Sequence, residues 1–144
     1  MLTFSWGAVI RSLLLILLFG SISCAVAAPL KVGVAGAHSG DLAPYGLPTL
    51  DAARMAVEAQ NLAGGVLGQP VQLLTLDDQC KPEIATNVAT RLVSENVDVV
   101  IGHICSGATK AALGIYQEAG VLVISPSATE TELKEKKHRV EDAL

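Results

Sequence analysis

The feature that most constrains the fold of this 144-residue chain is a regular alternation of short apolar segments with longer segments of helical pattern. The short segments are rich in Val, Leu and Ile, which is typical of strands buried on both faces. We predict strands at 30–36, 71–77, 97–102 and 121–125, and helices at 48–63, 82–96 and 106–119. Such alternation makes parallel βαβ units, so the predicted fold class is α/β, a doubly wound parallel sheet.

Proline and glycine positions set the boundaries of the predicted helices. Gly64 and Gly65 end the first helix, and Gly120 ends the third, because glycine accepts the positive φ that follows a helix. Pro82 suits the first turn of the second helix. Residues 38–46 are predicted to be a polar loop. The apolar faces expected of the first two helices are Ala52, Ala53, Met55, Ala56, Ala59 and Leu62, and Ile84, Val88, Leu92 and Val93.

Residues 1–27 have the features of a secretory signal peptide. Arg11 supplies positive charge, residues 13–19 form an apolar core, and small residues precede a cut before Ala28. The apolar core is shorter than the roughly 20 residues of a membrane span. We therefore expect export to the periplasm. Two alternatives stay open, a retained signal anchor and lipid attachment at Cys24.

Composition and motifs exclude several function classes. The chain carries 10 Lys and Arg against 14 Asp and Glu, with no basic patch or aromatic platform, so nucleic acid is not a predicted partner. His38, His103 and His138 are isolated, so neither a metal nor another cofactor is predicted. No nucleophile elbow, Walker loop or dinucleotide-binding motif is found. We therefore predict no catalytic residues and a protein that is not an enzyme.

Two cysteines, Cys80 and Cys105, each lie just past a predicted strand. If Cys24 leaves with the signal peptide, an even two cysteines remain in a chain bound for an oxidising compartment, where they can pair. We therefore expect a disulfide between Cys80 and Cys105. It would tie the loop after the second strand to the start of the third helix.

The loops after the first, third and fourth strands form the predicted binding region, because ligands of open α/β sheets bind outside the carboxyl ends of the strands. These loops hold Ser39 and Tyr45, residues 105–109, and residues 125–129. They offer hydroxyls, glycines, one aromatic ring and the free amides of a helix terminus. That set suits a small polar or zwitterionic ligand.

Several residues in these loops keep two interpretations each. Ser106 could bind a carboxylate through its hydroxyl and backbone N–H, or be an ordinary N-cap. Thr129 could bind an ammonium and a carboxylate, or be a turn residue. Tyr45 could pack over a ligand side chain or lie on the surface. His103 is predicted to be a packed, hydrogen-bonded histidine, and Asp77–Asp78 to stabilise a loop.

Several short motifs between about residue 30 and residue 133 are specific in combination. They are Lys31-Val32-Gly33-Val34, Ser39-Gly40, Tyr45-Gly46, Ala63-Gly64-Gly65, Asp77-Asp78-Gln79-Cys80, Val100 to Ser106, Ile124-Ser125-Pro126 and Ala128-Thr129. In these motifs the chain resembles the periplasmic binding proteins for branched-chain amino acids, which are receptors of ABC transporters. The resemblance implies a type I fold, of which this chain would be a partial N-terminal lobe.

The resemblance also implies a role for each matching residue. Ser106 would hold the ligand carboxylate through its hydroxyl and backbone amide. Thr129 would contact both carboxylate and ammonium, and the carbonyl of Ser127 would accept from the ammonium. Tyr45 would lie against the aliphatic side chain, and Ala128 completes the expected ligand-binding set. The cysteine spacing also resembles the disulfide of that family.

The expected function follows from this resemblance and its departures. Residues 28–133 would form part of the first lobe, and the charged residues 134–144 would diverge from it. Ser127 stands where Gly or Ala is common, which bears on the ligand. We expect a truncated copy of the substrate-binding component for amino acid uptake, with an ABC transporter permease as partner. Two alternatives stay open, a ligand-sensing module of the same fold that feeds a regulator and a non-functional remnant.

Overall fold

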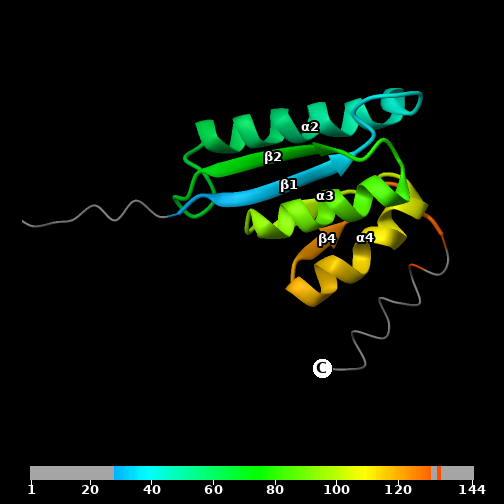
Figure 1. Ribbon diagram of the computed structural model, residues 1–144. Helices are drawn as coiled ribbons and strands as arrows, with labels where there is room; N and C mark the ends of the chain where they lie inside the picture. The colour runs from blue at the N-terminus through cyan, green and yellow to red at the C-terminus, as the bar shows by residue number, and fades with distance from the viewer. Residues whose placement is uncertain (1–27, 131–132, 134–144) are drawn as a thin grey trace, which may run out of the picture.

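A four-stranded parallel sheet with helices on both faces forms the body of the molecule (Figure 1). The computed structural model describes residues 28–130 and 133. The predicted signal peptide and charged tail lie outside the described residues. The elements in chain order are β1 (Leu30–Gly36), α2 (Ala43–Leu62), β2 (Val71–Asp77), α3 (Pro82–Ser94), β3 (Val99–Ile101), α4 (Ser106–Ala119) and β4 (Leu122–Ile124).

The strand order β2-β1-β3-β4, with every pair parallel, confirms the predicted doubly wound α/β class. β1 pairs with β2 along its full length, from Leu30↔Val71 to Gly36↔Asp77. These two strands have the predicted bounds. β3 and β4 are shorter than predicted, because their ladders with neighbouring strands cover only residues 99–101 and 122–124. β1 lies between β2 and β3, so the strand order reverses at β1.

Alternate side chains of the sheet enter two separate cores. Helices α3 and α4 cover one face and α2 covers the other (Figure 1). Ala35 and Val100 face α3 and α4, and with Leu92 and Tyr116 they belong to the larger buried cluster. On the α2 side the buried cluster is smaller and consists of Val34, Leu50 and Ala53. The apolar face predicted for α3 is confirmed, since Val88 and Leu92 are buried and Ile84 and Val93 pack against them.

The predicted start of α2 is wrong, because this helix begins at Ala43 and not at Pro48. Pro44 occupies the first turn, where its missing N–H has no intrahelical partner to lose. Pro48 lies inside the helix near its amino end, where it removes the one hydrogen bond that its N–H would have donated to Pro44. Buried Gly46 lets this first turn approach the end of β1, since a Cβ there would lie 1.8 Å from the carbonyl oxygen of Ala37.

The apolar face predicted for this helix is also largely wrong. Met55 and Leu62 are 71% and 83% exposed, and the buried residues of α2 are Gly46, Leu50 and Ala53. The helix lies over β1 and β2 and presents only a narrow stripe to them. Its end was predicted correctly, because Gly64 follows with φ +99°. Among residues 28–130 and 133, none of the helices combines the length and apolarity that a membrane crossing needs.

Candidate binding site at the carboxyl edge of the sheet

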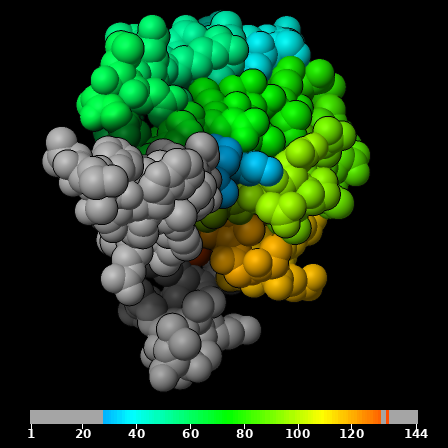
Figure 2. Space-filling view, turned by 90° about the vertical axis from the view of Figure 1, so that its left-hand side faces the viewer, coloured from blue at the N-terminus to red at the C-terminus, as the bar shows by residue number. Residues whose placement is uncertain are grey.

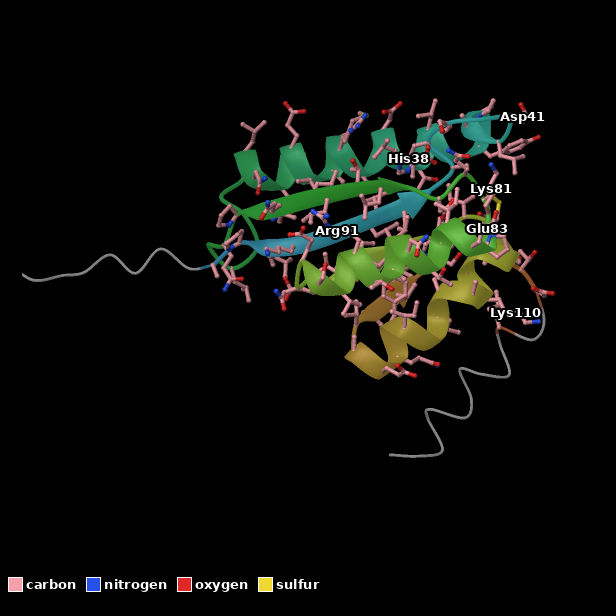
Figure 3. The ribbon with its side chains drawn as sticks, viewed as in Figure 1. His38, Asp41, Lys81, Glu83, Arg91 and Lys110 are labelled. Carbon is pink, nitrogen blue, oxygen red and sulfur yellow. A yellow bond between two sulfur atoms is a disulfide. The ribbon has the colours of Figure 1, made fainter. Side chains whose placement is uncertain are left out.

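The carboxyl ends of the strands and the amino ends of α2, α3 and α4 gather at one end of the molecule (Figure 1). In Figure 3, His38, Asp41, Lys81, Glu83 and Lys110 are labelled at this end. The strand order reverses between the loops after β1 and β3, which is where open α/β sheets bind ligands. The predicted binding loops therefore share one edge of the sheet.

A disulfide joins Cys80 and Cys105, as predicted, with their Cα atoms 5.4 Å apart. Cys80 follows β2, and Cys105 is the N-cap residue of α4. Figure 3 shows the sulfur bond at the same end of the molecule as Lys81. The bridge therefore fixes the amino terminus of α4 to the loop after β2.

Ser106 is the first residue of α4 and is not its N-cap, so the ordinary N-cap interpretation is wrong. The N-cap Cys105 makes no capping hydrogen bond with its side chain. The Ser106 hydroxyl oxygen instead accepts the backbone N–H of Thr129 at 3.2 Å. The structure thus brings together two predicted ligand-binding residues from the start of α4 and from the loop after β4.

The loop after β4 is held against the loop after β3 by serine hydroxyls. Ser125 Oγ donates to the carbonyl oxygen of His103 at 2.7 Å and accepts the N–H of Ala128 at 3.1 Å. Ser127 Oγ donates to the carbonyl oxygen of Ile104 at 2.8 Å. The hydroxyl of Ser127 therefore serves the loop itself and leaves its backbone carbonyl for the role expected of it.

Tyr45 lies on the first turn of α2 and not in a loop, and its side chain is 72% exposed. Among the described residues, no hydrogen bond or ring contact joins it to the other four predicted ligand-binding residues. Its proposed contact with a ligand side chain stays a prediction.

His103 is fully buried beneath these loops, and it is hydrogen-bonded as predicted. Its Nδ1 pairs with a carboxylate oxygen of Asp78, and its Nε2 lies 3.2 Å from the hydroxyl of Tyr116. All three side chains are 0% exposed. Burial, reinforced by the charge of Asp78, raises the pKa of Tyr116, so its hydroxyl stays protonated. This buried network connects the ends of β2 and β3 with α4.

Asp77 stabilises the loops at the end of β2, which confirms its predicted role. Its carboxylate accepts the N–H groups of His38 and Gln79, both at 2.9 Å, and the hydroxyl of Ser39. Partial burial on its own raises the pKa of Asp77. The hydrogen bonds outweigh this effect and hold its pKa below the usual range. The carboxylate therefore joins the loop after β1 to the loop after β2.

His38 carries a polar atom without a partner. Its Nε2 is buried and makes no hydrogen bond with any part of the chain that the structure describes. Burial lowers the pKa of His38, and this effect exceeds the opposite effects of Asp77 and Asp78, while Arg54 lowers it slightly further. The imidazole is therefore held in its neutral form at the end of β1.

An apolar hollow of about 260 Å³ lies elsewhere, between α2 and the sheet. Val32, Leu73 and Ile101 form its floor, and Ala53 and Val57 line it from α2. Figure 2 views the molecule from the end where β1 begins, with α2 at the top and the β4 region at the bottom. The hollow contains no charged lining residue and lies away from the serine-rich edge, so we do not assign the predicted binding site to it.

The contribution of Tyr116 to this edge was not predicted from the sequence, whereas Ser125 lies in the predicted loop 125–129. Thr109, Ala112 and Tyr116 are all buried and recur at helical spacing along α4, so the spacing marks the core-facing side of this helix. It could not reveal that the hydroxyl of Tyr116 meets His103. Within residues 28–130 and 133, no group of three potential ligating side chains is placed to hold a metal ion.

Comparison with known sequences gives one consistent result. Residues 29–139 match the family described as periplasmic binding protein. The Leu/Ile/Val-binding protein of Escherichia coli strain K12 is 42% identical over 109 residues, which cover 76% of this chain and 30% of that protein. A leucine-, isoleucine-, valine-, threonine- and alanine-binding protein of Pseudomonas aeruginosa is 40% identical over 122 residues, covering 85% and 32%. The chain thus spans about 30% of the length of the curated relatives it matches.

Solved structures show the same fold with more than one ligand. A branched-chain amino acid transporter substrate binding protein of Streptococcus pneumoniae, in complex with isoleucine, is 38% identical with a TM-score of 0.72, covering 75% of this chain and 31% of that one. A solute binding protein of R. palustris in complex with benzoate is 34% identical with a TM-score of 0.61, covering 69% and 28%. Both ligands carry a carboxylate, and only isoleucine carries an ammonium group.

Proposed function

The chain belongs to the periplasmic binding proteins, and from this premise we propose that it supplies part of the amino-acid-binding site of an ABC transporter's substrate-binding component. We propose branched-chain amino acids as the ligand class, because the relatives reported above are named for leucine, isoleucine and valine. The proposed ligand-binding residues are Tyr45, Ser106, Ser127, Ala128 and Thr129. We propose binding and not catalysis as the activity.

The observation that carries the proposal is the contact between Ser106 and Thr129 at the amino end of α4. The first amides of a helix lack intrahelical acceptors and carry partial positive charge, so they attract a carboxylate. The side chain of the N-cap Cys105 makes no hydrogen bond to those amides. A ligand carboxylate could therefore take the place of the Thr129–Ser106 hydrogen bond and accept from both residues.

The proposed acceptor for the ammonium group of the ligand is the backbone carbonyl of Ser127, in the loop after β4. The Ser127 hydroxyl is directed to the carbonyl oxygen of Ile104, and the Ala128 N–H is directed to Ser125. These bonds fix the backbone from Ser125 to Thr129 before a ligand arrives. Such a pre-ordered loop lowers the entropy that binding must overcome.

Titration of the purified chain with leucine, isoleucine and valine, followed by amide shifts in ¹⁵N–¹H NMR spectra, tests this function. We expect saturable shifts that concentrate at residues 103–109 and 125–129. Ser106→Ala should lower the binding affinity at least tenfold, because it removes a hydrogen bond to the charged carboxylate of the ligand. Ser94→Ala is the matched control, since its hydroxyl donates to the Arg91 carbonyl on α3. The site would be refuted if either segment, 103–109 or 125–129, showed no shifts.

A comparison of leucine with benzoate identifies the ligand class. Both carry a carboxylate for Ser106, but only leucine carries an ammonium group for the loop after β4. We expect leucine to shift the amides of both segments. Benzoate binding that equals or exceeds leucine binding would move the proposal to aromatic carboxylates, the class to which the ligand of the R. palustris protein belongs.

We further propose that residues 1–27 direct export to the periplasm and that a transporter permease is the partner. Expression of the full chain in a Gram-negative host, with mass spectrometry of the periplasmic fraction, tests the first point. A mature chain that begins at Ala28 is expected. A lipid-modified chain that begins at Cys24 would support the alternative of lipid attachment.

A further inference from the structure

We propose that His103, anchored by Asp78 and Tyr116, is the positioning residue of the binding site. It would hold the backbone of the loops after β3 and β4 in place, and with it their ligand-binding residues. It would not touch the ligand itself. The inference deepens the proposed function and relies on it for the identity of the ligand. The positioning effect itself can be measured without any ligand.

The His103 ring is anchored on both sides. Its Nδ1 pairs with a carboxylate oxygen of Asp78, and its Nε2 lies 3.2 Å from the hydroxyl of Tyr116. Asp78 is anchored in turn, because its other carboxylate oxygen accepts the N–H of Cys80 at 2.7 Å and its own N–H donates to Gly36 at 2.9 Å. The ring is thus fixed to the end of β1, to the β2 loop and to α4.

The backbone of His103 carries the contacts that matter to the site. Its carbonyl oxygen accepts hydrogen bonds from two hydroxyl groups, that of Thr109 at 2.9 Å and that of Ser125 at 2.7 Å. Ser125 then holds the N–H of Ala128. The following carbonyl, that of Ile104, accepts the hydroxyl of Ser127. A shift of the His103–Ile104 peptide would therefore move Ser125 and Ser127, and Ala128 with Ser125.

The disulfide alone cannot supply this order. It joins Cys80 to Cys105 and so fixes where α4 begins. None of its atoms reaches the loop after β4 through a hydrogen bond that the described residues show. The loop after β4 reaches the rest of the edge through His103, Ile104 and Ser106. Of these three residues, only His103 has a side chain that pairs with two fully buried side chains, those of Asp78 and Tyr116.

Amide hydrogen exchange of the ligand-free protein tests the proposal. His103→Leu keeps the volume of the ring but loses both hydrogen bonds and leaves Asp78 buried without its partner. We expect the amides of Ala128 and Thr129 to exchange roughly tenfold faster, a loss typical of one broken hydrogen bond, while those of β1 and β2 change less. His103→Asn, which keeps a donor near the Nδ1 position, should restore part of the protection.

Two further variants keep the test decisive if His103→Leu does not fold. Tyr116→Phe keeps the buried ring and removes only the hydroxyl that meets Nε2, so we expect a smaller acceleration at the same amides. Asn61→Ala is the control for general destabilisation, because it loses two hydrogen bonds to Val71 at the opposite end of the sheet. The proposal would be overturned if the amides of Ala128 and Thr129 kept their protection in folded variants. It would also be overturned if protection were lost equally throughout the sheet.

Leucine titration of the same variants separates the two proposals. If the wild-type chain binds leucine, the affinity should fall in the same order as the loss of amide protection, with the Asn61 control unchanged. If the wild-type chain binds no amino acid but the exchange pattern is as expected, the proposed ligand fails and the positioning role stands. If leucine binds equally well to His103→Leu and to wild type, the positioning role fails and the proposed function stands.

Discussion

The two faces of the sheet are built from similar strands but are covered very differently. On one face, α3 and α4 pack on Ala35 and Val100 and bury Leu92 and Tyr116 completely. On the other, α2 lies over β1 and β2, and Leu122 and Ile124 of β4 remain 63% and 54% exposed. The α3–α4 face therefore carries the larger buried core and orders the site, while the α2 face contributes a smaller one.

The sharpest test of this comparison is a pair of cavity-forming substitutions. Leu92→Ala should lower the free energy of unfolding by about 3–4 kcal/mol, because Leu92 is fully buried and packs on Gly33 and Val100. Leu50→Ala on the α2 face should cost about 2 kcal/mol, since that core is smaller. Urea unfolding followed by circular dichroism measures both. An equal or larger loss at Leu50 would break the comparison.

Removal of the disulfide tests whether the α3–α4 side depends on its cross-link. The bridge closes a loop with a sequence separation of 25 residues, so Cys80→Ala with Cys105→Ala should cost roughly 3 kcal/mol. Thermal unfolding with and without a reductant measures this loss. The reductant should destabilise the wild-type chain and leave the double variant unaffected. A double variant as stable as wild type would show that packing alone fixes the start of α4.

Acidification tests the carboxyl end of β1, where the two faces meet. The pKa of folded His38 lies below its ordinary value of 6.5, so the unfolded chain binds more protons as the pH falls through that value. Stability should therefore decline below about pH 6.5. Asp77 should add a second decline below its ordinary value of 3.8, because its folded pKa is lowered and the stability it contributes is lost when it is protonated.

His38→Leu separates the two declines. The variant should lose the first decline and keep the second. At neutral pH its stability should match or exceed that of wild type, because the buried Nε2 that it removes has no hydrogen-bond partner among the described residues. Melting temperatures measured between pH 7.5 and pH 3 test both points. A first decline of undiminished size in the variant would show that another group causes it.

The smallest effect is expected on the exposed part of the α2 face. Leu122→Thr should change the free energy of unfolding by no more than about 0.5 kcal/mol, since the side chain is largely exposed and threonine suits a strand. Val123→Thr should cost more, because Val123 packs against the α3–α4 core. Chemical unfolding measures both. A larger loss at Leu122 would show that its face is covered in solution.

Local sequence pattern predicted the parallel sheet, the bounds of β1, β2 and α4, and the end of α2. These features depend on short-range chemistry, such as apolar runs, helical spacing and the positive φ that glycine accepts at Gly64 and Gly120. The start of α2 was missed because two prolines lie close together there. The structure shows that the helix includes both of them, because it begins at Ala43, and Gly46 lets its first turn lie close to Ala37.

The sequence by itself determined the fold class, the sheet edge at which Ser106 and Thr129 lie, and the pairing of Cys80 with Cys105. Only the tertiary structure decided what each polar group at that edge does. It showed that Ser106 accepts from Thr129, and that His103 joins Asp78 to Tyr116. Helix and strand periodicity depends on neighbours in the chain. Those hydrogen bonds join residues up to 25 positions apart, and their partners are set by how the strands and helices pack.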